Sequence, residues 1–232
     1  EREPVLTWPE GNAWLTTRLA APLQQRLHTG CMVLRVREDR HTVDVDVWHE
    51  GEQLMERWTA PRVVLATPLF VSARLLEAPP AALLRAAQQM RTAPWLVANL
   101  HINEPLADHP GAAPSWDNVL YHSAGLGYVN AMHQSTRPFP GPTVLTAYRA
   151  LGGDSPAQAH QQRQRLLNEP WSAWAALVLQ DLSRAHADLG EKVKRIDLMR
   201  YGHAMSIPAP GVRSSAALAA LTQQGGRVRF AH

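Results

Sequence analysis

The pattern of apolar and polar positions predicts a helix and then a run of strands at the start of the chain. In residues 12–29 the apolar side chains recur at helical spacing, and Pro22 predicts either a kink within that helix or a later start of it. Beyond Gly30 the spacing changes to alternation, which is typical of half-buried antiparallel strands. The predicted strands cover residues 31–39, 41–48 and 53–60. Residues 62–67 form a continuous apolar run, which predicts a strand buried on both faces.

The rest of the chain mixes helices with strands. A helix is predicted for residues 79–90, and a longer helical region for residues 156–189, split near Pro170 and capped by Gly190. A loop rich in Pro, Gly and Asp occupies residues 106–117. Further strands are predicted at residues 94–105, 117–122, 127–133, 143–151 and 194–201. The last elements are a loop, a short helix and a strand, at residues 206–211, 214–223 and 225–232.

These elements predict an α/β fold of the mixed, α+β kind. The local signals are of the α/β type at both ends of the chain, while the middle combines a mixed sheet with helices. We therefore expect the first and last segments to belong to one domain, with a second domain inserted between them. The predicted boundaries are residues 1–69, 70–200 and 201–232.

Composition narrows the function classes. Of the 232 residues, 45% are hydrophobic and 19% are charged, as in ordinary globular proteins. Lys192 and Lys194 are the only lysines among 23 basic residues, and a net charge of +3 is too small to indicate nucleic-acid binding. No apolar run is long enough for a membrane span. The histidines lack ligand spacing, so no metal site is predicted; they include His101, His109, His122 and His133.

The two ends and the single cysteine give three further expectations. The chain opens without an initiator Met and stops on the short strand GGRVRFAH, so we expect an interior piece of a larger enzyme. Cys31 lies in a strand-like run and is expected to be a buried core thiol. One cysteine allows no internal disulfide. The compartment and the oligomeric state are left open by the sequence.

The order of three segments resembles the flavin-containing amine oxidase and phytoene-desaturase-like superfamily. The segments are WPEGNAWLTTRLAAPL, GCMVLRVREDRHTVDVDVW and RVVLATP, and the closing GGRVRFAH resembles a strand near the end of such proteins. The resemblance implies a partial FAD/NAD(P)-binding, Rossmann-like domain in residues 1–69 and 201–232. It implies a substrate domain of mixed β-sheet plus helices in residues 70–200. The implied activity is hydride transfer from an amine or apolar substrate to FAD.

The resemblance also implies cofactor contacts at five positions. Val33 matches a valine whose backbone meets the adenine, and Thr67 with Pro68 matches a turn beside the cofactor. Phe230 and Ala231 match the end of the closing strand, while His232 replaces the usual glycine. The G-x-G-x-x-G fingerprint that holds the pyrophosphate is absent, and GLGYVN at residues 125–130 enters a strand instead of a helix. We therefore expect that this chain alone does not retain FAD.

The substrate side is implied by the strand WLVANLHINEP. Amine oxidases of the family commonly carry a lysine there, and the match places Val97 at that position. Strand alternation puts Trp95, Val97, Asn99 and His101 on one face of the sheet. Either this face lines the substrate site, or it is an ordinary sheet face that carries two polar residues. Tyr201, in RYGHAMSIPAPG, is a further candidate for lining the site.

The missing lysine counts against standard amine oxidation and favours the desaturases and isomerases of the superfamily, whose substrates are apolar. A second hypothesis is a non-catalytic, hydrophobic-ligand-binding module derived from the same fold. Either way the expected partner is a small molecule, which the sequence does not identify.

Overall fold

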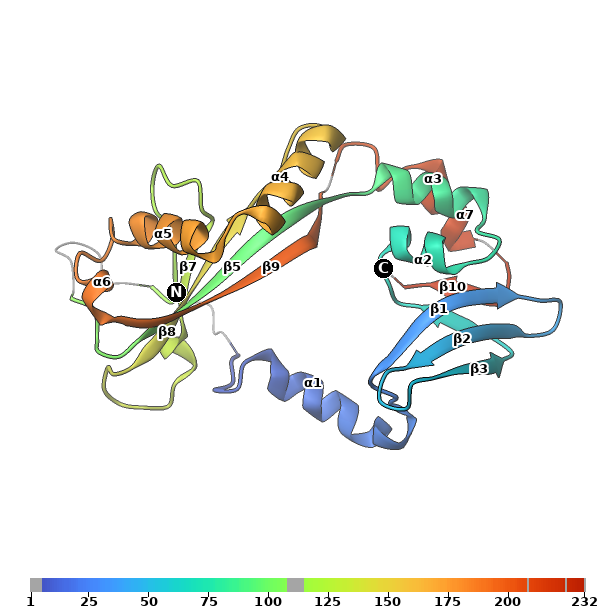
Figure 1. The fold of residues 1–232 in the computed structure, drawn as a ribbon, viewed down its shortest axis with the longest axis horizontal. Coiled ribbons are helices and arrows are strands. Elements are labelled where there is room, and N and C mark those ends of the chain that lie inside the picture. The colour runs from blue at the N-terminus through green and yellow to red at the C-terminus, as the bar shows by residue number, and fades with distance from the viewer. Residues whose placement is uncertain (1–5, 108–114, 208, 224, 232) are drawn as a thin grey trace. The chain divides into compact units, whose positions relative to one another are not determined.

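The computed structural model describes residues 6–107, 115–207, 209–223 and 225–231, and it contains two compact units (Figure 1). Unit 1 comprises Glu1–Pro22 and Thr92–Ser206, and unit 2 comprises Leu23–Arg91 and Ile207–His232. Each unit is therefore built from two separate stretches of sequence. The domain roles assigned above to residues 1–69, 70–200 and 201–232 stay predictions.

Unit 2 contains the predicted three-stranded meander. Strands β1 (Cys31–Glu38), β2 (Val43–His49) and β3 (Leu54–Ala60) pair antiparallel in the order β1-β2-β3. On β2 the valines face the core, while Asp44 and Asp46 face outward beside arginines of the two neighbouring strands. Hydrogen bonds from Arg57 and then Arg35 lower the pKa of Asp46 to about 2. Opposite charges across the strands thus support the pairing that the alternating sequence predicts.

The second sheet of unit 2 has two parallel strands, β4 (Val63–Leu65) and β10 (Val228–Phe230). The core of unit 2 also takes side chains from α2 (Leu69–Leu75), α3 (Ala81–Gln89) and α7 (Ala216–Gln223). The prediction that residues 62–67 are buried on both faces is wrong. Leu65 is buried but Val64 is 62% exposed, because the packed residues lie against one face of this short strand.

Arg227 fixes the start of β10. Its backbone N–H donates to the Glu38 carboxylate, and its guanidinium donates to the carbonyl oxygens of Arg40 and Pro61. The last segment of the chain is thereby joined to the meander and to the loop before β4. This contact explains how residues more than 160 positions apart form one unit.

Unit 1 is built on a five-stranded sheet in the order β6-β7-β8-β5-β9. The strands are β5 (Arg91–Ile102), β6 (Asp117–Asn118), β7 (Gly127–Asn130), β8 (Thr143–Ala150) and β9 (Val193–Ile207). The helices are α1 (Asn12–Ala20), α4 (Pro156–Asn168), α5 (Trp171–Leu182) and α6 (Leu189–Lys192). Short 3-10 helices cover Ala21–Arg26, where the kink at Pro22 was predicted, and Ala131–Gln134.

One face of the sheet in unit 1 carries its core. Alternate residues of β5 are buried there, and Trp174 with Val178 of α5 and Leu166 of α4 complete the cluster. Helix α4 begins with a capping box, in which Ser155 and Gln158 exchange side-chain to backbone hydrogen bonds. The opposite face of β5 stays half-exposed.

Four local predictions are wrong. The strand expected at residues 117–122 ends at Asn118, because the chain turns where the Ser123 N–H donates to the Leu120 carbonyl. Gly190 lies inside α6 instead of capping a long helix, because α5 ends at Leu182 and the following residues form turns. Cys31 is only partly buried, because it lies at the margin of the core. The loop expected from residue 206 begins later, since β9 continues to Ile207; Pro208 lies outside the described residues.

Two neighbouring leucines of α4 test the placement of the unit 1 core. Leu166 is fully buried and Leu167 is 46% exposed. Leu166→Ala is expected to lower the free energy of unfolding by about 3 kcal/mol, because it removes buried methyl groups and leaves a cavity. Leu167→Ala, with the same change of helix propensity, is expected to lower it by less than about 0.5 kcal/mol. Urea denaturation of both variants measures the difference, and equal effects would contradict this core.

Gly127 at the start of β7 tests the β6–β7 turn. Its φ is 111°, and a Cβ at this position would overlap the carbonyl oxygen of Asn118. Gly127→Ala is therefore expected to destabilise the protein by more than about 2 kcal/mol. Gly152→Ala is the control, because nothing lies within 4 Å of its added Cβ. Thermal unfolding of both variants should show a large fall in midpoint for Gly127→Ala alone.

Candidate functional site

The half-exposed face of β5 carries the four residues predicted to share it. Burial alternates along β5, with Trp95, Val97, Asn99 and His101 half-buried between fully buried neighbours. Their common face is therefore confirmed, while their role stays a prediction. We call this surface, with the cross-strand partners on β8, the open face of unit 1.

Aromatic and apolar groups occupy one part of the open face. Val97 lies opposite Tyr148 of β8 in the antiparallel register, and the Trp95 ring lies 6.4 Å from the Tyr148 ring, tilted by 59°. Burial is the main cause that raises the pKa of the Tyr148 hydroxyl, so this group stays protonated at neutral pH. This part of the face therefore presents two rings and an aliphatic side chain without a formal charge.

Asn99 adds one neutral polar group to the open face. It lies opposite Thr146, whose hydroxyl donates to Asn99 Oδ1 at 2.8 Å. With its oxygen used in this way, the Asn99 amide offers its nitrogen as a hydrogen-bond donor. This pair is the polar feature nearest to Val97 along β5.

His101 lies at the far end of the same strand and is held by β9. Its Nε2 lies 2.9 Å from Asp197 Oδ2, and Arg195 Nε donates to the other carboxylate oxygen at 2.8 Å. Hydrogen bonds from Arg195 and then His101 lower the pKa of Asp197. Tyr201, four residues further along β9, shares the face of Asp197 by strand alternation and is 48% exposed.

The predicted cofactor residues of unit 2 lie at two places. Thr67 and Pro68 follow β4, and Ala231 follows β10, where its N–H donates to the Leu65 carbonyl at 3.0 Å. Because β4 and β10 are parallel, these residues lie at the same carboxyl edge, which is where open α/β sheets bind ligands. Val33 and Phe230 instead pack their side chains against the core of unit 2. His232 lies outside the described residues.

The Thr67–Pro68 turn is fixed from within. The Thr67 and Ser72 hydroxyls lie 2.8 Å apart, and the Ser72 N–H donates to the Pro68 carbonyl as α2 begins. Ser72 is fully buried, so the turn is anchored to the core of unit 2. The turn at this edge is therefore tied to the core, and the exposed residues beside it, Ala66 and Ala231, are small.

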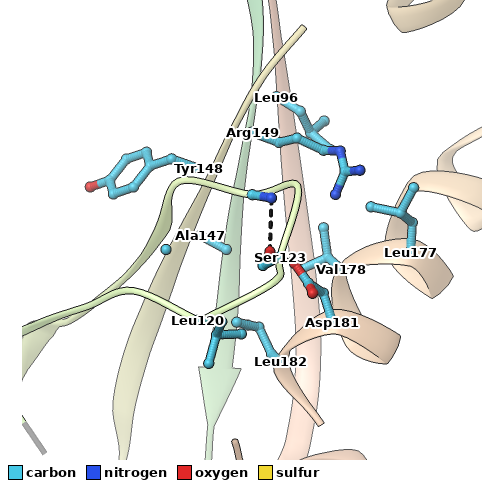
Figure 2. Close-up of a pocket in the computed structure, with 12 residues that line it drawn as sticks. Leu96, Leu120, Ser123, Ala147, Tyr148, Arg149, Leu177, Val178, Asp181 and Leu182 are labelled. Carbon is cyan, nitrogen blue, oxygen red and sulfur yellow. Dashed lines mark hydrogen bonds between the residues drawn. The ribbon is translucent and has the colours of Figure 1, made fainter. Parts of the chain in front are cut away.

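A small cavity that sequence reasoning missed lies on the helix side of the sheet in unit 1 (Figure 2). Ser123 donates to Asp181 of α5 and accepts from the Gly125 N–H at 2.8 Å. The cavity encloses about 20 Å³, which is room for a single water. The hydrogen bond between Ser123 and Asp181 therefore holds the turn after β6 against α5. The loop and helix residues that form this cavity are far apart in sequence, so no local pattern indicated it.

A larger hollow in unit 1, of about 290 Å³, lies beside a buried tyrosine–histidine pair. The Tyr128 hydroxyl lies 2.6 Å from His186 Nε2, and burial raises the pKa of Tyr128. The wall includes Leu106, Asn130 and Thr143. Leu106 stands just before residues 108–114, which lie outside the described residues.

Metal binding and membrane insertion find no support in the described part of the chain. In residues 6–107, 115–207, 209–223 and 225–231, no three His, Cys, Asp or Glu side chains are grouped to hold a metal ion. His101, one of the histidines considered above, is engaged with Asp197, and His109 lies outside the described residues. Among the described helices, none has the length and apolar character needed to cross a membrane.

Comparison with solved structures gives matches along almost the whole chain. Cyclohexylamine oxidase from Brevibacterium oxydans matches with a TM-score of 0.63 at 16% identity, over 95% of this chain and 46% of that one. Putrescine oxidase bound to putrescine matches with a TM-score of 0.65 at 14% identity, over 96% and 47%. A fatty acid isomerase from P. acnes matches with a TM-score of 0.58 at 14% identity, over 95% and 46%.

The chain spans just under half the length of each of these structures. No family model matches the sequence, and no curated protein matches it. At these low identities the structural likeness shows the fold alone. The resemblance read from the sequence is thereby confirmed at that level: the chain has the fold of part of the amine oxidases and the fatty acid isomerase that it matches.

Proposed function

We propose that the chain is part of an FAD-dependent oxidoreductase that transfers a hydride from an amine or apolar substrate to the flavin. The observation that carries this proposal is the match of 95–96% of the chain to structures that include two amine oxidases and a fatty acid isomerase. In this proposal residues 1–69 and 201–232 serve the cofactor, and residues 70–200 serve the substrate.

The carboxyl edge of β4 and β10 supports the cofactor role. Thr67, Pro68 and Ala231 end parallel strands there, and their small side chains let a planar group approach the backbone. One matched structure is a putrescine oxidase variant with redesigned cofactor binding. When bound, the flavin supplies the acceptor for the hydride. The pyrophosphate fingerprint is not in this sequence, so we propose that this chain alone does not retain FAD.

The open face of unit 1 supports an apolar substrate or a neutral amine. Trp95, Val97 and Tyr148 provide rings and an aliphatic side chain, and Asn99 provides a neutral donor. Asp197, the carboxylate bonded to His101 at the end of this face, is already paired with Arg195 and His101. These residues offer a substrate ammonium no free carboxylate, which favours the apolar class, although the charge of Asp117 on β6 also acts on Tyr148.

The alternative, a hydrophobic-ligand-binding module without redox chemistry, draws on the same apolar open face. The two functions differ in the cofactor and not in the ligand. A measurement of bound flavin therefore separates them.

The first test is the visible absorption spectrum of the full-length gene product. The enzyme proposal predicts the two absorption bands of oxidised flavin, released as FAD on denaturation. A folded, colourless protein that takes up no added FAD would overturn the enzyme proposal and leave the binding module.

A second test places a charge on the open face. Val97→Arg is expected to slow the bleaching of bound flavin by substrate roughly 10–100-fold, because the new side chain displaces the substrate from its reactive position. Cyclohexylamine, putrescine and a long-chain fatty acid are the substrates to try under anaerobic conditions. Val119→Arg is the control, because Val119 is 75% exposed in the turn after β6. Equal rates in both variants, with FAD retained, would remove Val97 from the site.

A further inference from the structure

Three side chains with complementary chemistry lie on adjacent strands of the meander in unit 2. Cys31 of β1 lies opposite His49 of β2 in the antiparallel register, and its Sγ is 3.4 Å from His49 Nδ1. The other ring nitrogen, Nε2, is 2.8 Å from Oε2 of Glu56 on β3. The three residues thus form a relay of thiol, imidazole and carboxylate, and none of them belongs to the surfaces described above.

Glu56 determines which nitrogen of His49 carries the proton. The indole N–H of Trp58 donates to Glu56 Oε2 at 2.6 Å, and this bond and then that of His49 lower the pKa of Glu56. An ionised carboxylate only accepts hydrogen bonds, so His49 Nε2 must be the donor. In the neutral ring Nδ1 is then the bare nitrogen, and it faces the Cys31 thiol. This is the arrangement in which a base, oriented by a third group, activates a nucleophile.

The thiol is also within reach of other molecules. Cys31 is only partly buried, at the end of β1 and at the margin of the core of unit 2. The Thr29 carbonyl, 3.5 Å from Sγ, is a second and longer acceptor for the thiol proton. Access and a nearby base are the two conditions that distinguish reactive cysteines from structural ones.

The remaining charged groups around the relay act in opposite directions. The His28 ring meets the Trp58 ring edge-on at 4.9 Å, and its positive form would favour the thiolate. Glu50 follows His49 in the turn after β2, and its negative charge would oppose the thiolate. The three relay side chains do not converge on one point, because His49 uses its two ring nitrogens for different partners. In the described part of the chain no three His, Cys, Asp or Glu side chains could hold a metal ion, so the relay is not a metal site.

We propose that Cys31 is an activated thiol that forms mixed disulfides with low-molecular-weight disulfides. The thiol proton moves to His49 Nδ1, and Glu56 accepts the Nε2–H of the resulting imidazolium. The thiolate attacks one sulfur of the disulfide, a new S–S bond forms to Cys31, and the old S–S bond breaks. The departing thiolate takes up the proton, so no other oxidant is needed. This activity is independent of the flavin chemistry proposed above.

Iodoacetamide alkylation and exchange with glutathione disulfide test the proposal on the native full-length protein. Mass spectrometry of the tryptic peptide 27–35 follows Cys31 alone. At pH 6 the alkylation rate is expected to exceed that of a free cysteine by about tenfold or more, because His49 Nδ1 lies within hydrogen-bond reach of the thiol and can accept its proton. The same peptide is expected to gain one glutathionyl group from glutathione disulfide.

Two substitutions separate the relay from simple exposure. His49→Gln is expected to lower the pH 6 rate by about tenfold, to that of free cysteine, because the amide offers no base to the thiol. His41→Gln is the control, because His41 lies in the turn at the other end of the β1–β2 hairpin and should leave the rate unchanged. Thermal unfolding of both variants confirms that they are folded. A wild-type thiol that reacts at pH 6 like free cysteine, or only after denaturation, would overturn the proposal whatever the variants do.

Discussion

The antiparallel pairing of β5 with β8, from Trp95–Ala150 to Ile102–Thr143, determines which side chains of unit 1 are buried. Because side chains alternate along a strand, this register sends Leu96, Leu100 and their neighbours toward the helices. The same register leaves Val97 and Asn99 on the open face. A slip of one residue would exchange the two sets, so the core that stabilises the sheet and the surface proposed for the substrate depend on one set of backbone hydrogen bonds.

Long alternating segments could be read from the sequence, and short or irregular ones could not. The meander and β5 were predicted because their period of two extends over many residues and reflects burial of one face. Residues 117–122 have the composition of a strand, but β7 offers only four residues for pairing, so the chain turns after Asn118. Gly190 resembles a helix cap in sequence, yet contacts of the preceding turns end α5 earlier.

The candidate sites show the same limit in another form. The shared face of Trp95, Val97, Asn99 and His101 follows from strand geometry, so the sequence was sufficient. The partners of these residues come from β8 and β9, and no local pattern indicates that Thr146 reaches Asn99 or that Asp197 reaches His101. Sequence alone therefore locates candidate side chains, while their charge state and free hydrogen-bonding groups require the tertiary contacts.

The meander of unit 2 uses its two faces differently. On its outer face, Asp44 and Asp46 pair with arginines of the neighbouring strands. On the face that holds the buried valines, the same register brings Cys31 to His49 at the margin of the core. The outer ion pairs lie in the middle of the strands, so they hold the register on which the relay depends without approaching the thiol. The thiol and its base lie on different strands, Cys31 on β1 and His49 on β2. The reactivity proposed for Cys31 therefore depends on the pairing of these two strands.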